Sequence, residues 1–187
     1  MKGGGAISAE IVEPYASALM SLAQENDLSD RLGEDARALR DVLKESQDLT
    51  QFLENPVIKL EDKKAVIRQL VGEQIHHYTL NFLMLLVDRG RILFLDDVCQ
   101  QYLALLRELN QTVLAEVTST VELSEGQKQA VCDRVKAMTD ARDVEIETHI
   151  DPTLLGGATI KVGSQFIDAS LRGQLRRIGM RLTQGAA

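Results

Sequence analysis

The chain has no tryptophan, few other aromatic residues and no long apolar stretch. Tyrosine and phenylalanine together make up 4% of the residues. The longest uninterrupted apolar run is Phe82–Val87, whereas a membrane-spanning helix needs about 20 apolar residues. We therefore expect no membrane span, and a core of leucine, valine, isoleucine and alanine, which suits packed helices.

Cysteine is also scarce. Cys99 and Cys132 are isolated from one another, and each lies within a helical pattern of apolar residues. We interpret both as small buried apolar residues in a reducing compartment rather than as a disulfide pair.

The sequence contains no motif that supports catalysis. It has no G-x-x-x-x-G-K-[ST] stretch that could hold a nucleotide phosphate. His76 and His77 are adjacent, but no cysteine or carboxylate stands at ligand spacing on the same helix face. We therefore predict a protein that is not an enzyme and that binds no metal and no cofactor.

Apolar residues recur at helical spacing over the first part of the chain. They predict six short helices, at about 8–25, 29–43, 49–53, 60–72, 78–88 and 95–110. Ser8 and Ser29 are expected to be the N-caps of the first two. Short amphipathic helices with short connections are typical of a compact bundle, so we expect a helical domain over residues 1–110.

The apolar period changes from helical to alternating at Thr112. Alternation predicts strands at about 112–121 and 144–150, separated by a helix that Ser124 caps. Two short apolar runs flank Gly163-Ser164, a two-residue hairpin that would place Ile160 opposite Ile167. We therefore predict an α+β protein, in which a small α/β domain at 111–187 follows the six-helix bundle in the order strand, helix, strand, hairpin, helix.

The last predicted helix is basic in an otherwise acidic chain. The net charge is −7, and residues 111–168 hold 10 acidic and 5 basic side chains, whereas residues 169–187 hold 4 basic and none acidic. Asp168 is expected to cap this helix. Its apolar stripe and unopposed cations predict a docking surface; the candidate contact residues are Leu171, Arg172, Leu175, Arg176, Arg177 and Arg181. The alternative is a nucleic-acid-binding helix, which the acidic remainder of the chain disfavours.

The predicted fifth helix is apolar on nearly every side. Such a helix lies at the centre of a domain or is covered on one side by a partner. Its apolar residues can simply form the core, and a groove between the first and fifth helices is the alternative. An amphipathic partner helix could then occupy that groove. The candidate anchors are Tyr15, Leu19, Leu22, Leu83, Met84 and Val87.

Several short motifs in one order resemble a known family. The C-terminal motif is the most specific: a D-P-x-L-x-G-G turn, an apolar strand and hairpin, and D-x-S-L-R before the basic helix. Ala169 stands where the family usually has glycine. The motifs stand here as Ile150–Gly157, Gly163-Ser164, Asp168–Arg172, Tyr15–Leu19, Phe52–Ile58, Phe82–Arg91 and Val117–Ser124. Together they resemble the delta subunit of the proton-translocating ATP synthase, which is homologous to the mitochondrial oligomycin-sensitivity-conferring protein.

The resemblance has implications for function and partners. It implies a non-catalytic stator connector that links the catalytic head to the peripheral stalk and supports proton-coupled ATP synthesis. The N-terminal domain would bind N-terminal helices of the alpha subunits, and the C-terminal domain would bind the b-type stalk subunits. It also implies a peripheral membrane protein on the cytoplasmic or stromal side of an energy-transducing membrane.

Overall fold

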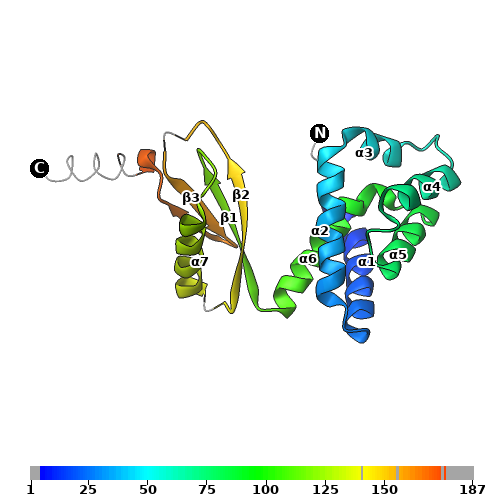
Figure 1. Cartoon of the computed structure of the whole chain (residues 1–187), viewed down its shortest axis with the longest axis horizontal. Coiled ribbons are helices and arrows are strands. Elements are labelled where there is room, and N and C mark those ends of the chain that lie inside the picture. Colours follow the sequence, from blue (N-terminus) through cyan, green and yellow to red (C-terminus); the bar gives the residue numbers. More distant parts are fainter. Residues whose placement is uncertain (1–4, 140, 155, 174, 176–187) are drawn as a thin grey trace, which may run out of the picture. The chain divides into compact units, whose positions relative to one another are not determined.

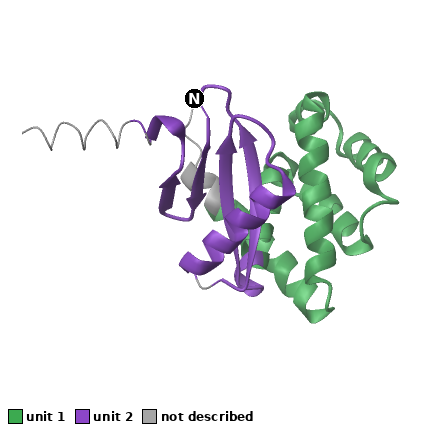
Figure 2. Cartoon of the chain, turned by 60° about the vertical axis from the view of Figure 1, so that its left-hand side comes forward, with its two compact units in different colours: residues 1–106 green, residues 107–187 purple. Residues whose placement is uncertain are grey.

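The computed structural model describes residues 5–139, 141–154, 156–173 and 175, and it divides the chain into two compact units. Unit 1 comprises residues 1–106 and unit 2 comprises residues 107–187 (Figure 2). Unit 1 is helical, and unit 2 combines a sheet with a helix (Figure 1). The fold therefore belongs to the α+β class.

Helices of unit 1 enclose one aliphatic core. The largest fully buried side chains there are Leu32, Leu83, Leu86, Val87, Val98 and the single aromatic Tyr102. This composition matches the core expected from a chain so poor in aromatic residues. The elements are α1 (Gly5–Glu25), α2 (Ser29–Glu45), α3 (Gln47–Glu54), α4 (Leu60–Val71), α5 (His77–Asp88), the short 3₁₀ helix η1 (Ile92–Phe94) and α6 (Leu95–Leu109).

The helix starts differ from two expectations. Ser8 lies within α1, which is already helical at Gly5, so it does not cap that helix. Ser29 is the first residue of α2, and Leu28 occupies the cap position without a side-chain hydrogen bond. Ser46 caps α3 instead, because its hydroxyl accepts from the backbone N–H of Leu49.

Two buried polar groups fix helices of unit 1 to one another. The carboxylate of Asp35 on α2 accepts from the backbone N–H of His76 at 2.8 Å and from the hydroxyl of Thr79 at 2.6 Å. These bonds hold the start of α5 against α2. The hydroxyl of Tyr102 donates to the carbonyl of Ser29 at 2.9 Å, and its burial raises the pKa of the phenol to about 12.

The sheet of unit 2 has four strands in the order β2-β1-β3-β4. β1 and β2 are parallel, whereas β3 is antiparallel to β1 and to β4. One sheet face packs against α7, where Val117, Val135 and Ile160 form the centre of the core. The elements are β1 (Thr112–Ser119), α7 (Glu125–Thr139), β2 (Asp143–Ile150), β3 (Ala158–Val162) and β4 (Gln165–Asp168).

Local details of unit 2 follow the sequence closely. Ile160 pairs with Ile167 across the hairpin, as the two-residue loop predicted. Gly163 in that loop has a φ of 56°, a conformation that glycine adopts without steric cost. Ser124 caps α7, since its hydroxyl accepts from the N–H of Gln127 while the Gln127 side chain accepts from the N–H of Ser124.

Candidate partner-binding sites

An apolar groove lies between α1 and α5 in unit 1. Its volume is about 410 Å³. All seven of its lining residues are apolar or aromatic, and none carries a charge. The lining residues are Pro14, Tyr15, Ala18, Leu19, Leu22, Phe82 and Leu85. A concave apolar surface of this kind is suited to an amphipathic helix.

The walls of the groove follow from helix geometry. Tyr15, Ala18 and Leu22 stand three and four residues apart, so they share one face of α1. Phe82 and Leu85 stand three apart on α5. Tyr15 and Phe82 meet edge to face with ring centroids 6.3 Å apart, so the two walls contact one another through these rings.

The structure separates the six predicted anchors into three groups. Tyr15, Leu19 and Leu22 line the groove. Met84 is half-buried and packs against the core. Leu83 and Val87 are 1% and 0% exposed, so their burial in the free chain argues against direct contact with a partner.

Phe82 and Leu85 line the groove but were not among the predicted anchors. Leu85 is 43% exposed. The apolar character of α5 on every side conceals which face is outward, because periodicity cannot orient a helix of that kind. The spacing of the apolar residues does distinguish two sides of α5. Leu83, Leu86 and Val87 form the i, i+3, i+4 stripe that faces the core, so Phe82 and Leu85 lie on another side.

The second candidate surface is the start of the last helix in unit 2. Leu171, Arg172 and Leu175 are all exposed there. Arg176, Arg177 and Arg181 lie outside the residues that the structure describes. The described part therefore presents two exposed leucines one helical turn apart, with one arginine beside them.

The turn that precedes the hairpin holds this helix start in place. The backbone N–H of Leu171 donates to the carbonyl of Gly156 at 2.9 Å. The Asp151 carboxylate accepts from the backbone N–H of Thr153 at 2.9 Å. Hydrogen bonds from the Thr153 side chain and backbone, and then the positive charge of Arg172, hold the pKa of Asp151 below its usual value.

Two glycines near the start of the last helix have no room for a side chain. Gly157 has a φ of 77°, and a Cβ atom there would lie 2.5 Å from the carbonyl oxygen of Ala169. A Cβ atom at Gly173 would collide with the carboxylate of Asp168. The group that lies closest to Gly173 is therefore this carboxylate and not another helix.

Ser170 caps the last helix, and the expectation for Asp168 is corrected. The hydroxyl of Ser170 accepts from the backbone N–H of Gly173 at 3.1 Å. Asp168 stands two residues before Ser170, and its carboxylate accepts from the backbone N–H and the hydroxyl of Ser170. The aspartate therefore orients the cap residue rather than capping the helix itself.

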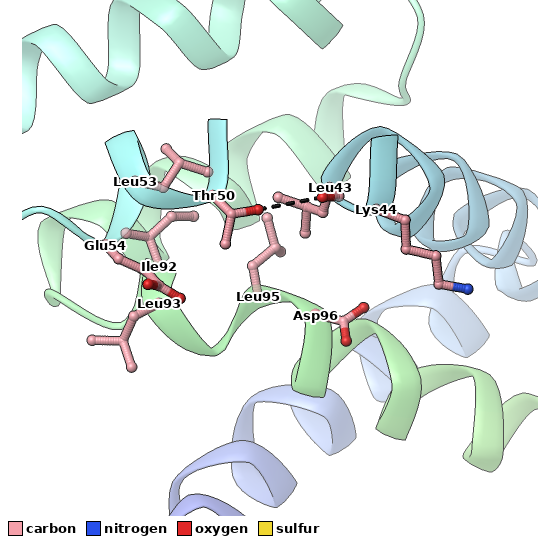
Figure 3. A pocket seen from close by; sticks show the side chains of 9 residues that line it. All are labelled: Leu43, Lys44, Thr50, Leu53, Glu54, Ile92, Leu93, Leu95 and Asp96. Carbon is pink, nitrogen blue, oxygen red and sulfur yellow. Dashed lines mark hydrogen bonds between the residues drawn. The ribbon is translucent and has the colours of Figure 1, made fainter. Parts of the chain in front are cut away.

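A further pocket in unit 1 lies among α2, α3, η1 and the start of α6. Its volume is about 220 Å³, which is smaller than a typical small-molecule site. Figure 3 shows Leu43, Thr50 and Leu95 at its middle, with Lys44 and Asp96 on one side and Glu54 and Leu93 on the other. The lining residues are Leu43, Lys44, Thr50, Leu53, Glu54, Ile92, Leu93, Leu95 and Asp96.

His76 has a structural role. His76 precedes α5, and its Nδ1 atom accepts from the backbone N–H of Tyr78 at 3.3 Å, which is a helix N-cap. Within the described ranges, no group of three or more His, Cys, Asp or Glu side chains is placed to hold a metal ion. None of the described helices combines the length and apolar content that a membrane crossing requires.

The fold and these surfaces define a class: a two-unit α+β protein whose candidate sites are surfaces for other chains. Comparison with known families is more specific. Residues 11–182 match the model of the ATP synthase delta (OSCP) subunit, and the chain belongs to this family. The family resemblance inferred from the sequence motifs is therefore confirmed.

Curated relatives extend the match over nearly the whole chain. The ATP synthase subunit delta of Trichodesmium erythraeum is 64% identical over 176 residues, which cover 94% of this chain and 97% of the relative. The corresponding subunit of Crocosphaera subtropica is 59% identical over 180 residues, with 96% and 97% coverage. These relatives give no support to the nucleic-acid-binding alternative.

One solved structure shows the same fold at low sequence identity. It is a chain of the Toxoplasma gondii mitochondrial ATP synthase hexamer, with a TM-score of 0.67 and 21% identity. The match covers 91% of this chain and 96% of that chain. The fold is thus shared with a chain of much lower sequence similarity than the curated relatives.

Proposed function

We propose that the chain is a non-catalytic stator connector of an ATP synthase. It links the catalytic head to the peripheral stalk, resists rotation of the head and so supports proton-coupled ATP synthesis. It is held through the complex as a peripheral protein on the cytoplasmic or stromal side of an energy-transducing membrane. The observation that carries the proposal, beyond family membership, is that each unit has an accessible apolar surface of its own: the groove of unit 1 and the exposed Leu171 and Leu175 of unit 2.

The helical unit binds the head through the groove between α1 and α5. The partner is an amphipathic helix at the N-terminus of an alpha subunit. Its contacts are Tyr15, Leu19 and Leu22 on one wall, and Phe82 and Leu85 on the other. The predicted anchors Leu83, Met84 and Val87 support these walls from within the core.

The sheet unit binds the b-type stalk subunits through the start of its last helix. Leu171 and Leu175 supply exposed apolar area, and Arg172 supplies charge. The remaining cations of that segment, Arg176, Arg177 and Arg181, extend the same basic sequence. A stalk segment with carboxylates near an apolar stripe is the matching partner.

Two weak sites are sufficient when they act on one complex. Burial of four aliphatic side chains contributes about 6–12 kcal/mol to the free energy of binding before the costs of association are subtracted. Association and ordering cost about 4–15 kcal/mol, so one such site alone is marginal. A second site on the same chain raises the effective concentration of the first, which strengthens the whole attachment without new contacts.

The groove can be tested in the full-length chain by calorimetry with a synthetic alpha-subunit N-terminal peptide. Wild type should bind with a negative heat-capacity change, which indicates apolar burial. Leu85→Ala should weaken binding about 10-fold, on the scale of one truncated contact side chain. Leu60→Ala is the matched control, because Leu60 is 44% exposed at the start of α4 and does not line the groove. Equal affinities for both variants would contradict the assignment.

The stalk surface can be tested with the quadruple variant in which Arg172, Arg176, Arg177 and Arg181 become glutamine. Affinity for the stalk should fall, and its salt dependence should flatten, because screening acts on exposed charges. Affinity for the alpha-subunit peptide should stay unchanged. Unaltered stalk affinity would show that the arginines are a solvated face and would leave Leu171 and Leu175 as the contact.

A further inference from the structure

β2 has an outer edge with no strand beside it in the described part of the chain. It is the first strand in the sheet order, and β1 is its neighbour on the inner side. All eight residues from Asp143 to Ile150 pair with β1 in one continuous parallel register. Roughly half of the backbone N–H and C=O groups of such a strand point away from its single neighbour.

This edge carries acidic side chains but few of the other features that usually prevent strand addition. Proteins protect edges with short strands, prolines, lysines, bulges or charged side chains that point inward. The opposite edge, β4, is short, at four residues. β2 has twice that length, contains no proline, glycine or lysine, and pairs without a bulge.

The two faces of β2 differ in chemistry. Glu145, Glu147 and His149 alternate on the face away from α7, while Val144 and Ile146 belong to the core on the α7 side. Burial decreases along the strand: Val144 is buried, Ile146 is partly buried, and Ile150 is 54% exposed. The apolar side is therefore incompletely covered toward the end of the strand.

Like charges lie close together on the acidic face. Glu116 on β1 is the direct register partner of Glu147 on β2, an arrangement that is unfavourable between adjacent strands. Glu116 is bound by Lys161 at 3.1 Å, and Glu145 is bound by Arg107 at 3.1 Å. Glu147 lies 3.9 Å from His149, which is a weaker contact. A cation placed outside β2 would offset this repulsion.

We propose that an extended segment of a partner chain adds to the outer edge of β2 as a fifth strand. The segment alternates basic residues, which face Glu145 and Glu147, with β-branched apolar residues, which continue the row of Val144 and Ile146. Backbone hydrogen bonds supply the attachment and the alternation supplies specificity, as in other cases of strand addition. The inference rests on the sheet and not on the head or stalk contacts proposed above.

Charge argues against a second copy of this chain as the occupant. Two β2 edges side by side would bring Glu145 and Glu147 of each chain against an equally acidic strand, and the net charge of −7 adds to this repulsion. A basic strand would pair with the outward backbone N–H and C=O groups of β2 and would place positive charge beside Glu145 and Glu147.

The test uses the full-length, ¹⁵N-labelled chain and an acetylated, amidated octapeptide that alternates lysine with valine. The peptide should shift the amide signals of Asp143–Ile150 and slow the hydrogen exchange of those amides that point away from β1, while β4 amides stay unchanged. An octapeptide that alternates glutamate with valine should bind at least about fivefold more weakly, since opposite charges across strands attract and like charges repel. Glu147→Lys should reverse this order of preference.

Glu73→Lys is the matched control, because it makes the same charge change at an exposed position in the turn before α5. It should preserve the preference for the basic peptide. Equal binding of both peptides, or no effect on β2 amides at millimolar peptide, would overturn the proposal. Protection, in the free chain, of the β2 amides that point away from β1 would also overturn it: concentration-dependent protection would identify a second copy, and concentration-independent protection would identify another part of the same chain.

Discussion

Leu83 and Leu85 are two residues apart on α5, and the structure assigns them opposite roles. Leu83 is 1% exposed and packs with the fully buried Leu86 and Val87. Leu85 is 43% exposed and lines the groove. Substituting each with alanine removes the same atoms, so any difference between the variants comes from the environment.

The expected losses in the free energy of unfolding differ severalfold between the two variants. Leu83→Ala should lower the free energy of unfolding of unit 1 by about 2–5 kcal/mol, because it leaves a cavity in a closed core. Leu85→Ala should cost about 1 kcal/mol or less, since much of its side chain already contacts water. For a unit of this size, each kcal/mol corresponds to about 4–8 °C in Tm.

Tyrosine fluorescence during urea unfolding reports unit 1 alone. The chain has no tryptophan, and all three tyrosines, Tyr15, Tyr78 and Tyr102, lie within residues 1–106. The unfolding midpoint should fall strongly for Leu83→Ala and little for Leu85→Ala, whereas peptide affinity should fall for Leu85→Ala. Equal destabilisation by both substitutions would refute the distinction between core and groove.

Three other predictions concern stability and reactivity. Gly157→Ala should destabilise the hairpin of unit 2 by about 1–3 kcal/mol, because alanine is strained at a φ of 77°; hydrogen exchange of β3 and β4 measures this. Asp35→Ala should lower the stability of unit 1 by about 1.5–3 kcal/mol in the tyrosine assay, since the N–H of His76 loses a charged acceptor. Cys99 is buried, and its burial raises the pKa of the thiol to about 12, so N-ethylmaleimide should label Cys132 in the native chain at pH 8 and leave Cys99 unmodified, as mass spectrometry would show.

Much of unit 2 could be predicted because its signals are local. Alternation at Thr112 marks the start of β1 at that residue, and the Gly163-Ser164 loop fixes the register of Ile160 and Ile167. Period-2 patterns are informative when one face is covered, as α7 covers this sheet. The interchange of Asp168 and Ser170 at the cap was not predictable, because both are good cap residues and only the backbone path selects one.

The groove illustrates where sequence reasoning ends. The apolar pattern indicated α1 and α5 as the two walls of a candidate groove. Tyr15 and Leu22 on α1 do line a groove in the structure. On α5, nearly every side is apolar, so Leu83 could not be distinguished from Leu85 until neighbouring helices were placed. The position of those helices depends on non-local contacts such as the Asp35 carboxylate with the N–H of His76, which no pattern in the sequence reveals.

Capture of the catalytic head on immobilised stalk subunits tests the central claim most directly, that one chain joins the two. Head should be retained when the full-length chain is added in equimolar amount, and not in its absence. Leu85→Asp should abolish retention of the head while the chain itself stays on the stalk, and the quadruple arginine variant should lose the stalk while it still binds the head. Retention of the head on the stalk without the chain, or a chain that binds only one of the two, would contradict the account.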